Sequence, residues 1–358
     1  MRRLLLGIAV LSACAHPRAP RPPDPDRPLP AAAYAHYLRG RLAALDGDHA
    51  RAAAELRAAA AVAPAEPRIQ VALAESLYRA GRRAEASRVI EAALARFDDS
   101  SAVARAAGRI YRGTGRPADA AAAYQHAIEL APDDEESYLG LASAWLGLRR
   151  ADRAEETYRA LLGRRPHSVR GHYRLARRLI AARRRAEAER HLRRVVELDP
   201  HHTRALVALA SIVRERGRPR EAVQLLREAF DRSSDVDVGR RLVRQLLELG
   251  ERDAAVDLIG QLDRDDLPLD VRLSLGDLYL DLVEREAALA LARRLAARHP
   301  SSAAVRLLEA RALAELGRRA EAAELLVRVA PERPGYAACR ALAGELMARD
   351  GKIADARA

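Results

Sequence analysis

Apolar and polar residues alternate at helical spacing along Ser101–Asp134, where the pattern of the chain is clearest. Gly108 and Tyr111 are three residues apart, and Ala120 and Tyr124 are four apart. Residues three or four apart share one face of an α-helix, so the spacing predicts two short amphipathic helices. Two such helices cannot bury their apolar faces alone, and they therefore require neighbours of the same kind.

The residues between and after these helices predict where each one ends. Gly115 suits the left-handed conformation that closes a first helix, and Pro117 suits the first turn of a second helix. Pro132 cannot continue the second helix and biases the preceding residue away from helical geometry. The stretch is therefore predicted to be a helix-turn-helix.

The same pattern recurs about ten times from residue 33 onward. The position of Ala120 holds alanine in every copy, and the sixth and seventh copies are each one residue shorter than the others. The other alanines of this column are Ala52, Ala86, Ala154, Ala188, Ala222, Ala255, Ala288, Ala322 and Ala356. Three copies depart from the pattern at the turn, where Arg149, Arg183 and Val283 replace the glycine.

A period of about 34 residues, with small residues at the positions of Gly108, Ala120 and Ala127 and proline at the position of Pro132, resembles the tetratricopeptide repeat. The resemblance implies an all-α fold, a right-handed superhelical solenoid of about nine and a half helix-turn-helix repeats. Nine repeats are expected in residues 33–336. Residues 337–358 are expected to form a partial tenth repeat, which is either a capping helix or a truncation.

The first residues form a separate segment. Arg2 and Arg3 precede the apolar run Leu4–Leu11, which is too short for a helix to cross the roughly 30 Å core of a bilayer. The following Leu-Ser-Ala-Cys resembles the lipobox of bacterial lipoproteins. This resemblance implies that residues 1–13 are a signal peptide and that Cys14 is lipidated. An ordinary secretory signal that contains a cysteine is the alternative.

Residues 14–32 link this segment to the repeats. Seven prolines among residues 15–30 exclude a packed core and predict an extended tether. The lipobox resemblance implies an exported protein that is lipid-anchored to the cell envelope. Ala15 after the cysteine favours the outer membrane facing the periplasm, with the inner membrane as the alternative.

Composition and motifs argue against catalysis. The net charge is +12, nearly all basic residues are arginine, and aromatic residues make up only 4%, too few for a surface that stacks bases or sugars. The sequence contains no HExxH, P-loop, GxSxG or CxxC motif, and His201-His202 lacks nearby third and fourth metal ligands. Cys339, beside Arg340, is either a reactive thiol or, as we favour, a small buried residue. The repeats account for every residue after the tether, so we expect a non-enzymatic protein without a metal or cofactor.

The tetratricopeptide resemblance also implies a ligand-binding groove lined by the first helix of each repeat. Its second, fifth, ninth and twelfth positions map onto a mainly basic set followed by an acidic one near the eighth repeat. These residues are Tyr37, Arg41, Tyr78, Arg105, Arg109, Arg112, Arg170, Tyr173, Arg177, Arg204, Arg214, Arg240 and Arg244, and then Asp270, Asp277 and the adjoining Asp281.

Two functions remain open at this point. The first is a membrane-anchored scaffold that mediates protein–protein interaction in cell-envelope assembly or secretion, with a protein partner that presents an acidic peptide segment. The second is a binder of an acidic polymer through the arginine-rich groove. For that second class a polysaccharide is favoured over nucleic acid, because export takes the chain away from nucleic acid. The competing explanation for the arginines is that arginine is common on every polar face of this chain.

Overall fold

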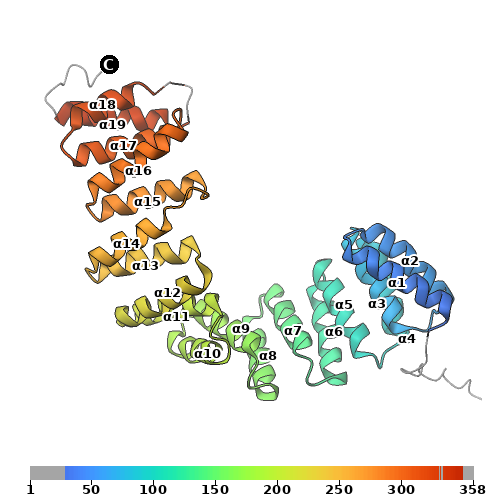
Figure 1. The fold of residues 1–358 in the computed structure, drawn as a ribbon. Helices are drawn as coiled ribbons and strands as arrows, with labels where there is room; N and C mark the ends of the chain where they lie inside the picture. Colours follow the sequence, from blue (N-terminus) through green and yellow to red (C-terminus); the bar gives the residue numbers. More distant parts are fainter. Residues whose placement is uncertain (1–28, 330, 332–333, 350–358) are drawn as a thin grey trace, which may run out of the picture. The chain divides into compact units, whose positions relative to one another are not determined.

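The computed structural model describes residues 29–329, 331 and 334–349, and in this part of the chain every regular element is an α-helix. The nineteen helices of the described residues (Figure 1) are α1 (Ala31–Leu45), α2 (His49–Val62), α3 (Pro67–Arg79), α4 (Arg83–Arg96), α5 (Ser101–Gly113), α6 (Pro117–Leu130), α7 (Glu135–Gly147), α8 (Ala151–Arg164), α9 (Val169–Ala181), α10 (Arg185–Leu198), α11 (Thr203–Glu215), α12 (Pro219–Ser233), α13 (Val236–Glu248), α14 (Arg252–Leu262), α15 (Leu269–Asp281), α16 (Arg285–Arg298), α17 (Ala303–Glu315), α18 (Arg319–Val327) and α19 (Tyr336–Arg349). None of these helices combines the length and apolar character that crossing a membrane requires. The predicted signal peptide, Cys14, most of the tether and Ala356 lie outside the described residues.

The helices pack in sequence order, which confirms the predicted all-α solenoid. The chain divides into two compact units within α9, after Gly171. In the N-terminal unit α1 packs on α2, α3 on α4 and α5 on α6, while the first helices α1, α3, α5 and α7 also pack on one another in succession. In the C-terminal unit α15 packs on α17, and α17 on α19, in the same way. The first helix begins at Ala31, two residues before the predicted start of the first repeat, because Pro30 already accepts a hydrogen bond from the Tyr34 amide.

The turn between the two helices of each of the nine described repeats has a left-handed residue, as predicted for the glycine of this turn. Six of these turns contain glycine with φ between 76° and 82°, at Gly47, Gly81, Gly115, Gly217, Gly250 and Gly317. Arg149, Arg183 and Val283 take the same conformation, with φ of 58°, 60° and 63°. A left-handed residue other than glycine costs about 1–2 kcal/mol, so three turns are held in place by the packing of the helices that they join.

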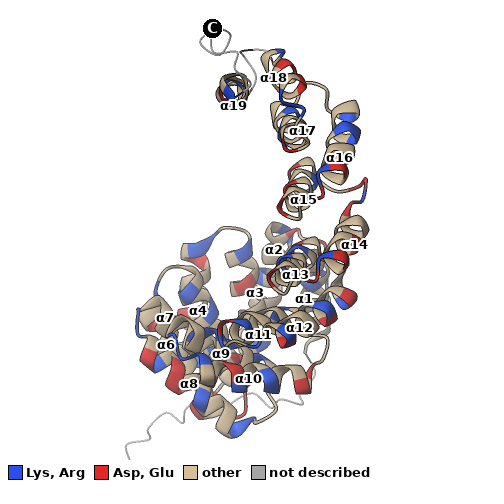
Figure 2. Cartoon of the chain, turned by 90° about the vertical axis from the view of Figure 1, so that its left-hand side faces the viewer, with Lys and Arg blue, Asp and Glu red and all other residues tan. Residues whose placement is uncertain are grey.

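An ion pair recurs at the start of the second helix. In five repeats the arginine that precedes this helix donates to the acidic residue three positions later, at distances between 2.6 and 2.8 Å. The pairs are Arg82–Glu85, Arg116–Asp119, Arg184–Glu187, Arg218–Glu221 and Arg318–Glu321. A carboxylate in the first turn also lies near the positive end of the helix dipole. Basic and acidic residues are interspersed along the helices (Figure 2).

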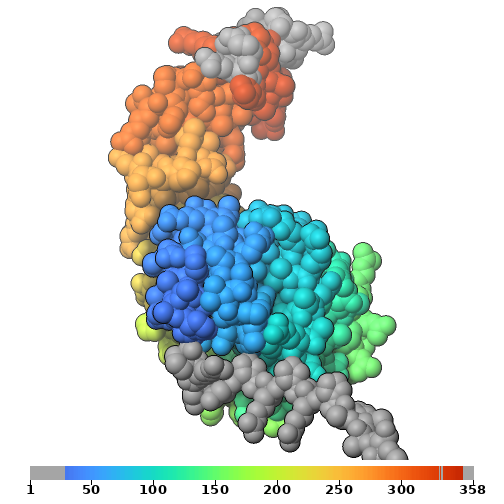
Figure 3. All heavy atoms as spheres, turned by 90° about the vertical axis from the view of Figure 1, so that its right-hand side faces the viewer, coloured from blue at the N-terminus to red at the C-terminus, as the bar shows by residue number. Residues whose placement is uncertain are grey.

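The core depends on close approach between neighbouring helices. Every described alanine of the predicted column, from Ala52 to Ala322, is fully buried. The ring of Tyr124 in α6 fills the space between Gly108 of the same repeat and Gly140 of the next, and a β-carbon at either glycine would overlap the ring. One cluster of buried apolar residues extends from Ala53 to Ala144, so the N-terminal helices share one core. Figure 3 shows the outer atoms of these helices, in blue to cyan, lying side by side.

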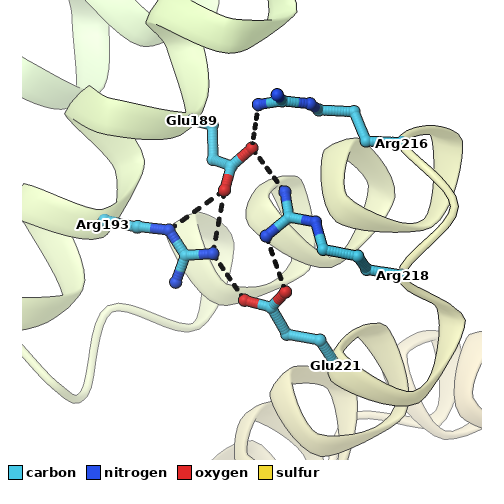
Figure 4. A network of polar contacts seen from close by, with 5 residues as sticks. All are labelled: Glu189, Arg193, Arg216, Arg218 and Glu221. Carbon is cyan, nitrogen blue, oxygen red and sulfur yellow. Dashed lines mark hydrogen bonds and ion pairs between the residues drawn. The ribbon is translucent and has the colours of Figure 1, made fainter.

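A charge network around one buried carboxylate joins consecutive repeats in the C-terminal unit (Figure 4). Glu189 in α10 is only 6% exposed. One of its oxygens accepts a 2.8 Å hydrogen bond from Arg193, and the other accepts bonds from Arg216 and Arg218 of the following repeat. Glu221 in α12 bridges Arg193 and Arg218. The buried carboxylate of Glu189 thus has three partly exposed guanidinium partners, which makes its burial tolerable.

The arginines also determine the protonation state of Glu189. Burial alone would raise the pKa of its carboxyl, but hydrogen bonds from Arg218, Arg193 and Arg216 outweigh burial and lower the pKa from 4.5 to about 2. The carboxylate therefore stabilises the folded state at neutral pH. A folded-state pKa below the unfolded one means that this stabilisation is complete above pH 5 and is lost as the pH falls toward 2.

The first prediction concerns this network. Glu189→Gln should lower the free energy of unfolding by about 3 kcal/mol at pH 7, since a pKa shift of one unit corresponds to about 1.4 kcal/mol. The difference from the unchanged chain should shrink progressively between pH 5 and pH 2 in urea unfolding followed by circular dichroism. Glu197→Gln, which removes an exposed pair with Arg194 on the same helix, is the control and should cost less than about 1 kcal/mol at any pH. If the free energy of unfolding lost in Glu189→Gln did not change with pH, the charge of Glu189 would not be the source of the stabilisation.

The second prediction concerns the strained turns. Val283→Gly should raise the free energy of unfolding by about 1 kcal/mol, because the relief of left-handed strain exceeds the extra freedom that glycine has in the unfolded chain. The reverse change at an equivalent turn, Gly250→Val, should lower the thermal unfolding midpoint. A midpoint of Val283→Gly at or below that of the unchanged chain would show that the turn carries no strain.

Candidate ligand-binding cleft

The arginine row of the third repeat is largely occupied within the chain. Arg105 donates to the Asp134 carboxylate at 2.9 Å, and Arg109 forms an ion pair with Glu75. Arg112 donates to the hydroxyl of Ser143 at 3.2 Å. Two of the three predicted groove cations in this repeat are therefore neutralised by carboxylates outside α5.

Several of these pairs join the same position in successive repeats. Glu75 and Arg109 both occupy the ninth position of their repeats, and so do Asp277 and Arg311. Arg170 and Glu136 both occupy the second position. The hydrogen bond from Arg170 lowers the pKa of the Glu136 carboxyl below its ordinary value of 4.5. Opposite charges at the same position of successive repeats can be recognised in the sequence. These pairs were missed because each repeat was considered separately.

The three predicted groove tyrosines take part in packing. Tyr37 contacts the apolar clusters of the first repeats, and the Tyr78 hydroxyl donates to the Gly113 carbonyl at 3.3 Å. The ring of Tyr173 lies against that of His202, with centroids 4.6 Å apart. In the predicted acidic region, Asp277 is paired with Arg311, whereas Asp270 and Asp281 are exposed.

The remaining predicted arginines are differently placed. Among the residues that the structure describes, Arg41, Arg177, Arg204 and Arg244 have no hydrogen-bond or ion-pair partner. Arg41 lines a cleft of about 200 Å³ between α1 and α3, where Glu75 also lies. Arg244 lies in a larger cleft, together with two further predicted residues.

This cleft has a volume of about 560 Å³ and lies between α11 and α13. It brings together the predicted residues Arg214, Arg240 and Arg244, and it adds Arg241, which lies outside the predicted groove positions. The other residues that line it are Ala210, Ser211, Leu226, Asp237, Gln245 and Glu248.

Two stacking positions of α13 that line the cleft are polar, and one of them, Gln245, is buried. In α5 these positions hold Ala106 and Ile110, which are buried against the preceding repeat. In α13 they hold Arg241 and Gln245. A guanidinium cannot be buried without a counter-charge, so Arg241 remains exposed and α11 does not cover it. In the sequence this site is indicated by Arg241, which stands where α5 has the small residue Ala106.

The cleft has an excess of positive charge. Four arginines face two carboxylates, and those carboxylates are only loosely engaged. Arg214 is 3.8 Å from Glu248, and Arg240 is 3.5 Å from Asp237, both longer than a charge-assisted hydrogen bond of about 2.8 Å. Glu248 is instead held by the amide of Gln245 at 2.8 Å.

Donors in the cleft also remain unused. The Nε atom of Arg240 is buried without a hydrogen-bond partner, and Arg241 and Arg244 have no polar partner among the described residues. An arginine presents a planar fork of donors that matches a carboxylate, so an acidic ligand would satisfy these groups.

The cysteine and histidine side chains considered for other chemistry have structural roles. Cys339 is fully buried, and burial raises the pKa of its thiol, as expected for a small core residue. His202 caps α11 by accepting the amide hydrogen of Ala205 at 3.2 Å. Within the described part of the chain, no three His, Cys, Asp or Glu side chains are grouped as a metal site would need.

Comparison with known proteins agrees with the repeat structure. A model of the tetratricopeptide repeat matches residues 71–135, 105–169 and 273–337, and a second model of this repeat matches residues 179–235. A tetratricopeptide repeat protein of known structure from Parabacteroides merdae is 17% identical, covering 70% of this chain and 99% of its own, with a TM-score of 0.47. YrrB, described as a repeat protein with an unusual peptide-binding site, is 15% identical over 51% of this chain and 94% of its own, with a TM-score of 0.41. Pseudomonas aeruginosa pilF is 19% identical over 58% and 96%, with a TM-score of 0.43. A search of the curated proteins gave no match.

Proposed function

Because the chain belongs to the tetratricopeptide repeat family, whose fold is that of a protein-interaction scaffold, we propose that it is a non-enzymatic, membrane-anchored adaptor that holds an acidic segment of a partner protein in the α11/α13 cleft. The observation that carries this proposal is the set of four arginines in one cleft, two of them without a partner among the described residues. Each such arginine can form two parallel hydrogen bonds with one carboxylate.

The size of the cleft favours a short segment. A volume of about 560 Å³ lies within the roughly 300–1,000 Å³ of sites that enclose small ligands, and it accommodates a few residues of an extended peptide. Gln245 and Ser211 supply neutral polar groups beside the arginines. A peptide with two neighbouring acidic side chains would therefore be matched in both charge and hydrogen bonding.

An acidic polymer is a poorer match to the arginines. A long polyanion needs a continuous track of free cations, because its affinity grows with the number of charges neutralised. Arg105, Arg109 and Arg170 on the first helices already have acidic partners within the chain. Their pairing interrupts the basic groove, whereas the cleft holds two neighbouring arginines, Arg241 and Arg244, without a partner among the described residues.

Membrane anchoring and a role in cell-envelope assembly or secretion rest on the N-terminal sequence. The charged start, the apolar run and the Leu-Ser-Ala-Cys tetrapeptide occur together at the spacing of a lipoprotein signal. Two or more acyl chains are needed for stable attachment, and lipobox processing would supply them. We propose Cys14 as the attachment point and the outer membrane as the location.

The third prediction tests the cleft. A labelled hexapeptide with two adjacent glutamates should bind the full chain in a fluorescence titration, and its glutamine counterpart should bind at least about tenfold more weakly, because charge-assisted bonds contribute roughly 1.5–3 kcal/mol each. Arg244→Gln and Arg241→Ala should each weaken the acidic peptide about tenfold.

Arg109→Gln is the matched control, since Arg109 is already paired with Glu75. Equal losses in the control and in Arg244→Gln would show that binding follows total charge and would favour the acidic polymer. So would an affinity for polyglutamate that rises steadily with its length.

The fourth prediction tests the anchor. The unchanged chain should remain in the membrane fraction of bacterial cells after a high-salt wash, and Cys14→Ser should be recovered in the soluble fraction. Val283→Gly, which leaves the N-terminal sequence intact, is the control and should stay with the membrane. Retention of Cys14→Ser in the washed membrane would exclude lipidation of Cys14 as the means of attachment.

A further inference from the structure

The charged residues of α13 that line the cleft follow one another in an unusual order. Asp237, Arg241, Arg244 and Glu248 are four, three and four residues apart, which gives the order acid, base, base, acid. At 3.6 residues per turn their side chains lie within about 60° of the helix surface, so they form one row along the helix. No other first helix of a repeat has this order of charges at these positions.

The two carboxylates of this row do not neutralise its two arginines. Asp237 precedes Arg241 by four residues, and Glu248 follows Arg244 by four, which is the spacing of ion pairs on a helix. Arg241 and Arg244 nevertheless have no polar partner among the described residues. The row is therefore positive at its centre and negative at both ends.

Gln245 holds one of these ends in place. It is only 3% exposed, and its Nε2 donates a 2.8 Å hydrogen bond to one carboxylate oxygen of Glu248. The other oxygen of Glu248 lies 3.8 Å from Nη1 of Arg214, in α11. A side chain packed in the interior has little freedom to move, so Gln245 keeps Glu248 at the end of the row and away from Arg244.

The length of the row limits what can lie along it. The cleft is lined by α13 from Asp237 to Glu248, so a segment that fills it runs along the row. At 1.5 Å per residue each end carboxylate lies about 6 Å beyond the nearer arginine, which is about two residues of an extended segment. Two neighbouring acidic side chains can reach Arg241 and Arg244, whereas a further acidic residue on either side meets a carboxylate. Like charges placed this close oppose binding.

We propose that the cleft selects a short acidic pair flanked by uncharged residues and discriminates against longer acidic runs, with Asp237 and Glu248 as the residues that determine this selectivity. Gln245 is a positioning residue that acts through Glu248. Selectivity of this kind rests on the proposed function, the binding of an acidic segment by this cleft. It narrows the partner to a protein whose recognised segment contains an isolated pair of aspartates or glutamates rather than an acidic tail.

Fluorescence titration of the full chain with two labelled peptides tests this selectivity. The peptides are Ser-Ser-Glu-Glu-Ser-Ser and hexaglutamate. The unchanged chain should bind the isolated pair at least as tightly as hexaglutamate, although hexaglutamate contains more acidic pairs. Asp237→Asn combined with Glu248→Gln should reverse the preference and make hexaglutamate bind at least about tenfold more tightly than the isolated pair, because the repulsion at both ends is removed.

A control variant with the same change in net charge makes the result specific. Glu251→Gln combined with Glu286→Gln removes two exposed carboxylates outside the cleft, and it should keep the preference of the unchanged chain. If the unchanged chain and this control both prefer hexaglutamate as strongly as the Asp237/Glu248 variant does, the proposal is overturned, while the binding of acidic segments stands. If neither peptide binds any of the three proteins, the cleft is not a site for acidic segments and the proposed function fails as well.

The role of Gln245 has a test of its own. Gln245→Met has a side chain of similar length without the hydrogen bond, so Glu248 becomes free to pair with Arg244 and the isolated acidic pair should bind about threefold more weakly. Adding Glu248→Gln should restore the affinity. A loss that persists in the double variant would show that Gln245 acts through packing alone, and its positioning role would be excluded.

Discussion

The stacking of each first helix on the repeat before it is the interaction on which the rest of this structure depends. It requires small residues where backbones approach, such as Gly108 and Gly140, and a large residue such as Tyr124 to fill the remaining space. The buried alanine column keeps the two helices of each repeat equally close. Each repeat contacts only its neighbours, so the stability of the array is a sum over the interfaces between successive repeats. An unusual residue at one interface therefore changes that interface and leaves the others intact.

Two surfaces of the chain that are open to a ligand lie where the stacking of repeats departs from the common pattern. In α13 the stacking positions hold Arg241 and Gln245, and the junction opens into a cleft with unmatched positive charge. In α1 the same positions hold Leu38 and Leu42, which are suitable for stacking, and no described repeat stacks on them. One exception has polar residues where a neighbour is present, and the other has apolar residues where a neighbour is missing. Both follow from the requirement that holds the array together.

Much of the fold could be predicted from the sequence because the pattern is periodic. The alanine column and the left-handed glycine turns follow from residue type and spacing, whereas Arg149, Arg183 and Val283 are left-handed against their residue type, because their place in the repeat requires it. The site was harder to predict. Assigning fixed groove positions selected Arg214, Arg240 and Arg244, which the structure brings into one cleft, but it also selected Arg105 and Arg109, whose partners lie outside α5. Whether an arginine is free depends on side chains of the neighbouring repeats, and a list of positions within one repeat contains no such information.

The ion pairs between equal positions of successive repeats give the repeats an order. Asp277 of the eighth repeat faces Arg311 of the ninth. The seventh repeat carries Arg244 at that same position, so removal of the eighth repeat would set Arg244 beside Arg311, with like charges in place of an ion pair. The repeats share one architecture and yet are not interchangeable. The gain or loss of a whole repeat would preserve the repeat period and yet place like charges at equivalent positions. The order of charges along the array therefore favours the order in which the repeats now stand.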